Sequence, residues 1–356
     1  MKRLKFNVGN DLKKSKCLKL HIGKNSNDCL PLFIRDKQLQ HVTEITYLGD
    51  IVNGNGRNIN NIKNRVCKAR GLINDVFSIL DKVCFGPHYF RVALLLRKTI
   101  IISSVLYNSD VWYNLSSEEI SELNKVDKVF FTRLFKVPVS ATFIAFFLET
   151  GDMELEMYMK SKRVIYFHNL VNRPKNQTIF SYFMVQYYKR SPCYWITTTL
   201  QDFTDIELDS SFQFLENTSI LRFKKMVNEK IRKYAFHSLL TRKYGKSKLK
   251  NLTYNKLEIQ SYLTQDNLTV MDKINIFKWR TLMVEGFGEN FRGGRGTIFC
   301  PLCHKHPDSQ EETFNNCLYI RNLFGVEGNY RDIFVETQIP ENLNKTISRI
   351  TRTRKK

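Results

Sequence analysis

Residues 53–80, NGNGRNINNIKNRVCKARGLINDVFSIL, contain the point at which the local pattern of the sequence changes. The Asn-Gly-Asn-Gly stretch at 53–56 is a strong turn signal. After it, apolar residues recur at intervals of three and four, which predicts an amphipathic helix. Its apolar stripe consists of Ile59, Ile62, Val66, Ala69, Ile73, Val76, Phe77 and Leu80. Arg57, Arg65 and Lys68 fall on the side opposite this stripe, so the helix is expected to present cations to solvent or to phosphate.

Before this point the sequence favours short strands, and after it the sequence favours helices. Segments 17–22, 30–34 and 45–52 are rich in strand-forming residues and are separated by Asn, Gly and Asp turns. Helical patterns follow from about His88, from Ser116, and over 153–171, 216–240, 254–263 and 269–284. The expected fold class is mainly α, with a small N-terminal antiparallel β segment, a multi-helical body and a C-terminal turn that resembles a zinc knuckle.

Three of these helices carry more detailed expectations. Val92, Leu95, Leu96 and Thr99 are expected to share one face of the helix that begins near His88. Ser116 and Glu119 fit a capping box at the start of the next helix. In the 216–240 helix, Phe223, Val227, Ile231 and Tyr234 form an apolar row, while Lys225, Asn228 and Arg232 line another side.

The charge balance points to a polyanionic partner. The 356 residues include 56 Lys and Arg against 34 Asp and Glu, a formal net charge of +22. Neutralising such a surplus with phosphates releases counterions, which favours DNA or RNA as the partner. A membrane partner is not expected, because no basic amphipathic helix with a lipid-facing apolar side is evident. The oligomeric state is not indicated.

The basic residues are clustered in four runs, at 2–24, 57–70, 222–250 and from Lys345 onward. A single run of charge is more often a solvated face than a binding site, but four runs in one chain favour binding. The candidate phosphate contacts are Arg57, Lys63, Arg65, Lys68, Arg70, Arg222, Lys225, Arg232, Arg292 and Arg295. The last two belong to the Gly-rich stretch 286–296, which is interpreted as a loop because a phosphate-cradling motif would need a preceding strand and a following Lys-Ser or Lys-Thr.

The sequence favours an intracellular location, with the nucleus suggested by the basic charge. The start of the chain is basic but has no continuous apolar stretch after it, so no secretory signal is expected. The longest apolar tract, 92–106, is interrupted by Arg97 and Lys98, which makes it too short to span a bilayer. Eight cysteines in this setting are expected to be reduced thiols.

Cys300-Pro301-Leu302-Cys303 is the strongest local chemical signal. Two thiolates at this spacing can reach one tetrahedral zinc ion, and Cys317 lies at a suitable distance for a third ligand. The fourth ligand is either His306 or Glu312. The alternative is a loop of the same shape that holds no metal. A catalytic zinc is not expected, since no general base is placed around these residues.

Several stretches, taken in order, resemble the reverse transcriptase of non-LTR retrotransposons of animal genomes. They include Tyr47-Leu48-Gly49-Asp50, residues 66–73, residues 85–90, residues 108–113, residues 160–163, residues 287–294 and the cysteine segment. The resemblance covers most of residues 10–320. It implies that Tyr47, Leu48 and Gly49 form a turn that helps to hold the primer end.

The resemblance also implies a domain order. Residues 1–55 would be the end of a palm, 56–135 a thumb-like helical domain and 136–285 a helical linker. Residues 286–325 would be the Gly-rich loop with a CCHC-like knuckle, and 326–356 a basic tail. In related knuckles a histidine stands where this sequence has Glu312.

The catalytic centre of the family needs an Asp-Asp pair that holds two metal ions. No Asp-Asp occurs in this sequence, so the chain is expected to begin downstream of the active site, with no catalytic residue and no catalytic Mg²⁺ site. Three functions stay open. The chain is a nucleic-acid-binding module, part of an RNA-directed DNA polymerase that is active only as a longer polypeptide, or a decayed element with no molecular role.

Overall fold

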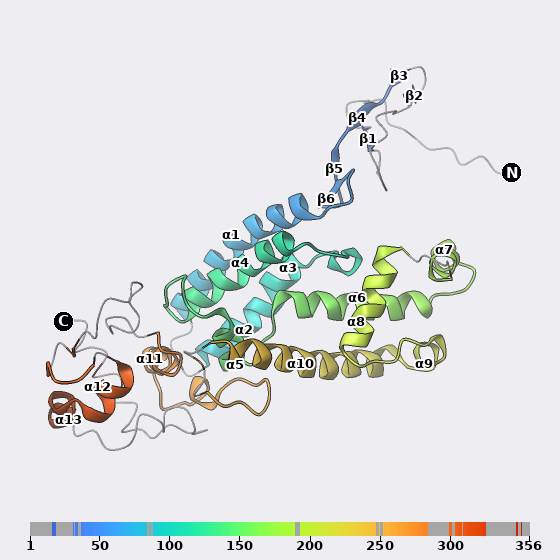
Figure 1. Ribbon diagram of the computed structural model, residues 1–356. Coiled ribbons are helices and arrows are strands. Elements are labelled where there is room, and N and C mark those ends of the chain that lie inside the picture. The colour runs from blue at the N-terminus through green and yellow to red at the C-terminus, as the bar shows by residue number, and fades with distance from the viewer. Residues whose placement is uncertain are drawn as a thin grey trace.

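The structure is a computed structural model. It describes residues 16–18, 31, 33–34, 37–83, 86, 88–188, 193–246, 249, 252–283, 299–300, 303–307, 309–324, 347 and 350. These residues form a mainly helical protein with short strands near the N-terminus, which confirms the predicted fold class (Figure 1). The predicted domain boundaries stay a prediction.

The strands form three two-stranded sheets. They are β1 (Lys16–Leu18), β2 (Phe33–Ile34), β3 (Lys37–Gln38), β4 (Gln40–Val42), β5 (Glu44–Tyr47) and β6 (Asp50–Asn53). The pairs β2–β3 and β5–β6 are antiparallel, as predicted. The β1–β4 pair is parallel, which the sequence did not indicate. The β5–β6 hairpin leads directly into α1, so the turn at 53–56 marks the predicted change of pattern.

The helical body begins with α1 (Ile59–Val83), which packs lengthwise against α4 (Ser117–Leu134). Seven of the eight residues of the predicted apolar stripe of α1, from Ile62 to Leu80, are buried, and Ile59 is half-buried. The capping box at the start of α4 is confirmed, because Ser116 Oγ accepts from the Glu119 N–H and the Glu119 carboxylate accepts from the Ser116 N–H.

The helix that follows α1 buries a different face from the one predicted. It runs through α2 (Tyr89–Leu96), a π-helical segment η2 (Arg97–Ile102) and α3 (Ser103–Val105). Its buried residues include Phe90, Ala93, Arg97 and Ile101, whereas Leu95 is 59% exposed. The buried face includes Arg97, which is fully buried beside two aspartates.

The remaining helices surround α6 (Leu155–Val171), as Figure 1 shows. They are α5 (Phe143–Thr150), α7 (Thr178–Tyr187), α8 (Tyr194–Asp205), α9 (Phe212–Glu216) and α10 (Ile220–Tyr244), with a short 3₁₀ turn η3 (Ser109–Val111). Of the predicted row in α10, Phe223, Val227 and Ile231 are buried and Tyr234 is half-buried, and the buried row continues through Ala235 and Leu239. The helix predicted at 254–263 is wrong, since residues 254–260 are not helical and only a 3₁₀ turn, η5 (Ser261–Leu263), follows them.

The C-terminal part contains α11 (Val270–Arg280), α12 (Gln310–Asn316) and α13 (Leu318–Phe324). Phe314 of α12 packs edge-on against Trp279 of α11, with ring centroids 6.0 Å apart. This contact joins the cysteine segment to the helical core. None of the helices in the described ranges combines the length and apolar character that crossing a membrane requires.

Candidate metal centre and basic surfaces

The first two cysteines lie on a tight turn. Phe299 and Pro307 form an isolated antiparallel bridge, and the Cys300 N–H donates to the His306 carbonyl at 2.8 Å. Within the turn, the His304 N–H donates to the Cys300 carbonyl at 2.8 Å, and His304 takes a left-handed conformation with φ +54°. This closed turn fixes the backbone of Cys300 and Cys303 relative to each other.

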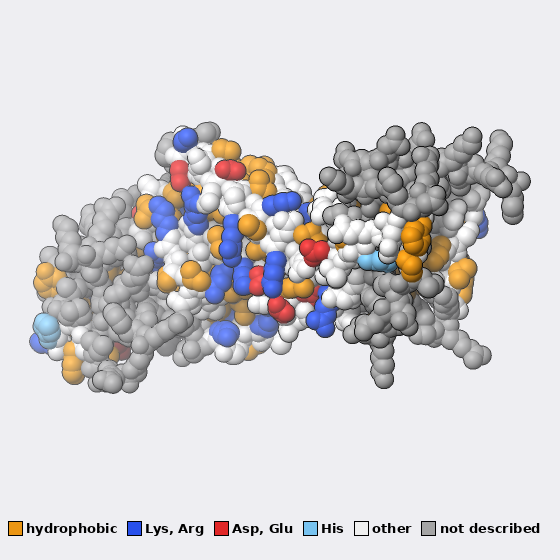
Figure 2. Space-filling model, turned by 90° about the horizontal axis from the view of Figure 1, so that it is seen from above, with side chains coloured by type: hydrophobic (Ala, Val, Ile, Leu, Met, Phe, Trp, Pro, Cys, Tyr) orange, Lys and Arg blue, Asp and Glu red, His pale blue; other side chains and the backbone are white. Residues whose placement is uncertain are grey.

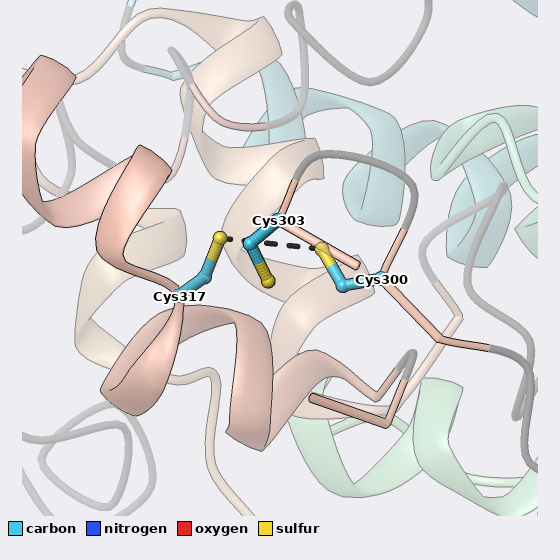
Figure 3. A group of neighbouring side chains, drawn as sticks. All are labelled: Cys300, Cys303 and Cys317. Carbon is cyan, nitrogen blue, oxygen red and sulfur yellow. Dashed lines mark hydrogen bonds between the residues drawn. The ribbon is translucent and has the colours of Figure 1, made fainter. Parts of the chain in front are cut away.

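The third cysteine comes from the helical side. Ser309 begins α12 and its hydroxyl accepts from the Glu312 N–H at 3.1 Å, while Cys317 ends the same helix. The sulfur atoms of Cys300, Cys303 and Cys317 all lie within 4.8 Å of one another, and those of Cys300 and Cys317 are 4.0 Å apart. Figure 3 shows the three side chains converging. The group could therefore hold a metal ion.

The environment favours a thiolate at Cys303. Burial by itself raises the pKa of the Cys303 thiol, but hydrogen bonds from the N–H groups of Lys305 and His306 and from the other two thiols hold this pKa below its usual value. Metals bind the thiolate form of cysteine, so a lowered pKa favours metal binding at neutral pH.

Neither predicted fourth ligand joins the three sulfurs among the residues that the structure describes. The group of mutually close ligand atoms contains only the three cysteines, although both His306 and Glu312 are described. The Glu312 carboxylate instead accepts from the Asn316 side chain at 2.6 Å. His306 is half-buried, and its backbone carbonyl is bonded to Cys300.

The predicted cations of α1 divide into two kinds. Lys68 and Arg70 are exposed and have no hydrogen-bond or ion-pair partner within the described ranges. Lys63 is exposed and lies 3.4 Å from the Glu118 carboxylate. Arg57, just before the helix, is also exposed.

Arg65 is the exception, and the expectation that it faces solvent is wrong. It is only 7% exposed, forms an ion pair with Asp50, and donates to the Ser104 carbonyl at 3.0 Å. Its guanidinium also lies over the Tyr107 ring. Arg65 therefore ties α1 to the hairpin and to α3, because its position at the edge of the apolar stripe brings it against the neighbouring helix.

Figure 2 looks down on the side of the body where α1 and α4 lie, and Lys and Arg side chains gather along the middle of this face. Lys63, Arg70 and Asn74 are spaced by seven and four residues, which places them on the edge of α1 that faces α4. There Arg133 of α4 donates to the Asn74 side chain at 2.7 Å. Arg70 thus lies along the seam between the two helices.

On α10, Arg222 and Lys225 are exposed, as predicted, and so are Lys224 and Lys233. Arg232 is different, because its guanidinium donates to the carbonyls of Gly151 at 3.0 Å and Leu257 at 2.5 Å. Arg292 and Arg295 lie outside the described residues. Tyr47, Leu48 and Gly49 form the tip of the β5–β6 hairpin, where Tyr47 is 65% exposed and Leu48 and Gly49 have positive φ.

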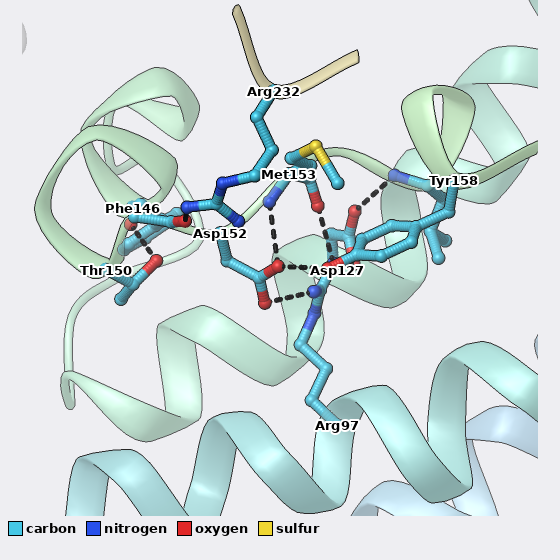
Figure 4. Close-up of polar contacts among 10 residues, drawn as sticks. Arg97, Asp127, Phe146, Thr150, Asp152, Met153, Tyr158 and Arg232 are labelled. Atoms are coloured by element: carbon cyan, nitrogen blue, oxygen red, sulfur yellow. Dashed lines mark hydrogen bonds and ion pairs between the residues drawn. The ribbon is translucent and has the colours of Figure 1, made fainter. Parts of the chain in front are cut away.

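A set of buried charges was not predicted from the sequence. Arg97 donates to Asp127 and Asp152, both at 2.5 Å, and to the Met153 carbonyl at 3.2 Å (Figure 4). Further buried pairs join Arg163 to Asp202 at 2.7 Å and Arg280 to Glu149 at 3.1 Å. The signal for the first was the presence of Arg97 and Lys98 inside the apolar tract 92–106, since a cation that is buried with such a tract must find acids.

Burial and charge shift the pKa values in this cluster. Burial alone would lower the pKa of Arg97, but Asp127 and Asp152 raise it above its usual range. Burial raises the pKa of Asp127 to about 6, although Arg97 opposes the shift. One guanidinium is shared by two buried carboxylates, so the cluster carries one acid more than it has bases.

No family model, curated protein or solved structure matches the chain.

Proposed function

We propose that this protein is a nucleic-acid-binding module that contacts the phosphate backbone through the exposed cations of α1. The observation that carries the proposal is the positive charge of the first part of α1. Residues 59–74 contain four basic residues and no acidic one. Of the four, Lys68 and Arg70 are exposed without a protein partner in the described part of the chain. Exposed cations that have no acidic partner contribute most to binding free energy when phosphates replace their counterions.

The outer side of α10 supports the same function. Arg222, Lys225 and Lys233 are exposed and recur at intervals of three and eight, which places them on one side of the helix with Glu229 among them. The α10 helix as a whole contains eight Lys and Arg and a single acid. In Figure 1, α1 and α10 lie on opposite sides of the helical body. A nucleic acid could therefore be contacted on two surfaces.

We further propose that the chain derives from a non-LTR retrotransposon reverse transcriptase and acts in the nucleus. The order of the motifs supports this origin, as do the exposed turn at Tyr47–Gly49 and the three cysteines that follow the helical body. The sequence contains no Asp-Asp pair, so we expect no primer extension by this chain alone.

Zinc is the metal that suits the cysteine group best. Three thiolates on short elements form a donor set typical of structural zinc. His306 is the better candidate for the fourth donor, because imidazole is the commoner ligand at such sites and the Glu312 carboxylate is already bonded to Asn316. The bound metal would hold the turn at 300–306 against Cys317.

The nucleic-acid proposal is tested by fluorescence anisotropy with labelled duplex and single-stranded oligonucleotides at increasing salt. Each phosphate contact contributes about 0.9 to the slope of log affinity against log salt for duplex DNA. The double variant Lys68→Gln/Arg70→Gln should lower both the affinity and this slope, by up to about 2. Arg173→Gln/Lys175→Gln, which removes two exposed cations outside the basic runs, is the matched control. Binding that does not respond to salt, or equal losses in the two variants, would contradict the proposal.

The zinc proposal is tested by measuring metal content after purification in the presence of zinc. We expect a single zinc ion per wild-type chain and none in Cys300→Ser. His306→Ala should weaken zinc retention against a chelator more than Glu312→Ala does. Equal zinc content in wild type and Cys300→Ser would contradict the assignment of the metal site.

A further inference from the structure

A pocket of about 440 Å³ opens between α2 and α10, away from the surfaces discussed above. One wall is the outer face of α2 and the start of η2, where Arg91, Leu94, Leu95 and Lys98 follow helical spacing. Its size is within the range of pockets that hold small ligands.

The opposite wall is rigid. Residues 149–152 run against the backbone of residues 258–260, through the Thr150–Ile259 bridge and a hydrogen bond from the Gln260 N–H to the Glu149 carbonyl at 2.9 Å. Gly151 has φ +65°, and a Cβ there would lie 2.2 Å from the carbonyl carbon of Glu258. The two segments therefore touch backbone to backbone.

Arg232 enters the pocket from α10 and is held in place by this wall. One of its terminal nitrogens donates to both the Gly151 and Leu257 carbonyls. In Figure 4, Asp152 lies between Arg232 and Arg97. The remaining N–H groups of Arg232 have no protein acceptor among the residues that the structure describes, so the guanidinium is oriented in advance for a further anion.

Asp152, the acid at the floor of the pocket, already has hydrogen-bond donors. Asp152 accepts from Arg97 at 2.5 Å and from the Tyr158 hydroxyl at 2.6 Å. Burial, together with the nearby charge of Asp152, raises the pKa of Tyr158 far above its usual value, so its hydroxyl stays protonated. Glu258, on the rim, forms an exposed ion pair with Lys256 at 2.9 Å.

Three cations and two acids line the pocket. Of the two acids, Asp152 is paired with the buried Arg97, whereas Glu258 is paired only with the exposed Lys256. Arg91 and Lys98 are exposed on one wall and Arg232 is fixed on the other. Leu94, Leu95 and Ile259 add apolar surface beside them. Cations beside apolar side chains in one pocket suit a ligand that combines a phosphate with a flat, weakly polar group.

We propose that this pocket binds one nucleotide unit, with its phosphate between Lys98, Arg91 and Arg232. The unit can come from a nucleic-acid strand, in which case the inference rests on the proposed function, or from a free mononucleotide. In either case the chemistry recognised is a phosphate ester, and the site is separate from the outer rows of α1 and α10.

The test uses the full chain with two probes, adenosine monophosphate and a single-stranded oligonucleotide, and isothermal titration calorimetry as the readout. Arg91→Gln/Lys98→Gln should weaken binding of the responsible probe about tenfold or more, because two charge-assisted contacts are lost. Glu258→Gln should strengthen it, because a repelling charge is removed. All of these side chains are exposed, and thermal unfolding checks that the variants fold.

A second readout does not depend on substitution. Acetylation of Lys98, measured by mass spectrometry, should slow when the probe is bound, while acetylation of the exposed Lys175 should not. Loss of oligonucleotide binding in the pocket variant assigns the pocket to a strand, and loss of adenosine monophosphate binding alone assigns it to a free nucleotide.

The outcomes separate the two proposals. If the wild-type chain binds the oligonucleotide but neither the pocket variants nor Lys98 labelling responds to either probe, the pocket inference is wrong and the proposed function stands. If no oligonucleotide binds but adenosine monophosphate protects Lys98, the proposed function is wrong and the pocket inference stands.

Discussion

The cations in the middle of the helical body and those on its outer helices have the same chemistry and opposite surroundings. Arg97, Arg163 and Arg280 are buried, and each lies against buried acids. Lys68 and Arg70 on α1 and Arg222 on α10 are exposed. A basic residue that is paired with a buried acid therefore stabilises the fold, whereas an exposed basic residue without an acidic partner is available to bind a ligand.

The largest expected effect comes from removing a buried cation. Arg97→Met should lower the free energy of unfolding by about 3–5 kcal/mol, since Asp127 and Asp152 would be buried without a counter-charge. Chemical denaturation monitored by circular dichroism measures this loss. A loss below about 1 kcal/mol would mean that water reaches the two aspartates, and the distinction between buried and exposed cations would not hold for Arg97.

The excess acid of the same cluster should give a pH-dependent stability. The pKa of Asp127 is raised in the folded protein, from 3.8 to about 6, so the folded state binds the proton more tightly than the unfolded state. The free energy of unfolding should therefore fall as pH rises from 3.8 to 6, by roughly 3 kcal/mol for this group alone.

The contribution of Asp127 is isolated by comparison with Asp127→Asn, because burial lowers the pKa of His168 and gives it a trend of opposite sign near the same pH. The variant leaves Arg97 paired with Asp152, so it should fold. As pH rises from 4 to 7, the free energy of unfolding of the wild type should fall relative to that of the variant. A difference that does not depend on pH would contradict the raised pKa.

Arg65 should behave as a buried cation although it lies within the basic run 57–70. Arg65→Met should cost about 2 kcal/mol, the typical value of a hydrogen-bonded charge. Burial raises the pKa of Asp50, but hydrogen bonds from Arg65, Asn108 and Asn61 lower it below its usual 3.8. Asp50 therefore stabilises the fold above pH 3.8, and this stability is lost as pH falls further. The cost of Arg65→Met, measured by denaturation at several pH values, should shrink at low pH. A constant cost would argue against the ion pair.

The smallest effect on stability is expected for the exposed cations. Lys68→Gln/Arg70→Gln should change the free energy of unfolding by no more than about 0.5 kcal/mol, as is usual at the surface. The same variant should lose nucleic-acid affinity in the salt titration described above. A large loss of stability would mean that Lys68 and Arg70 stabilise the fold as Arg97 and Arg65 do, and would contradict the distinction.

Much of the helical fold could be predicted because its signals are local. The spacing from Ile62 to Leu80 identifies α1, and Ser116 with Glu119 identifies the start of α4, because neighbours within one or two turns determine both. Cys300 and Cys303 were identified for the same reason, since their spacing alone brings the thiols together. The partners of Arg97 were not predictable, because they lie 30 and 55 residues away. The pocket depends on contacts between segments that are still further apart, such as Arg232 with Gly151.

Gly151 has a consequence for how the gene can evolve. A glycine codon changes at its first or second base only to codons for larger residues or to a stop codon, and any side chain at 151 would meet the backbone of Glu258 and Ile259. Nearly every amino-acid change at this codon should therefore damage the protein, while codons for exposed residues nearby can drift. In any comparison of homologous sequences, those under selection for the protein should retain this glycine, whereas sequences that no longer encode a functional protein should lose it at the neutral rate. The codon for residue 151 therefore indicates whether a homologous gene is still under selection for its protein.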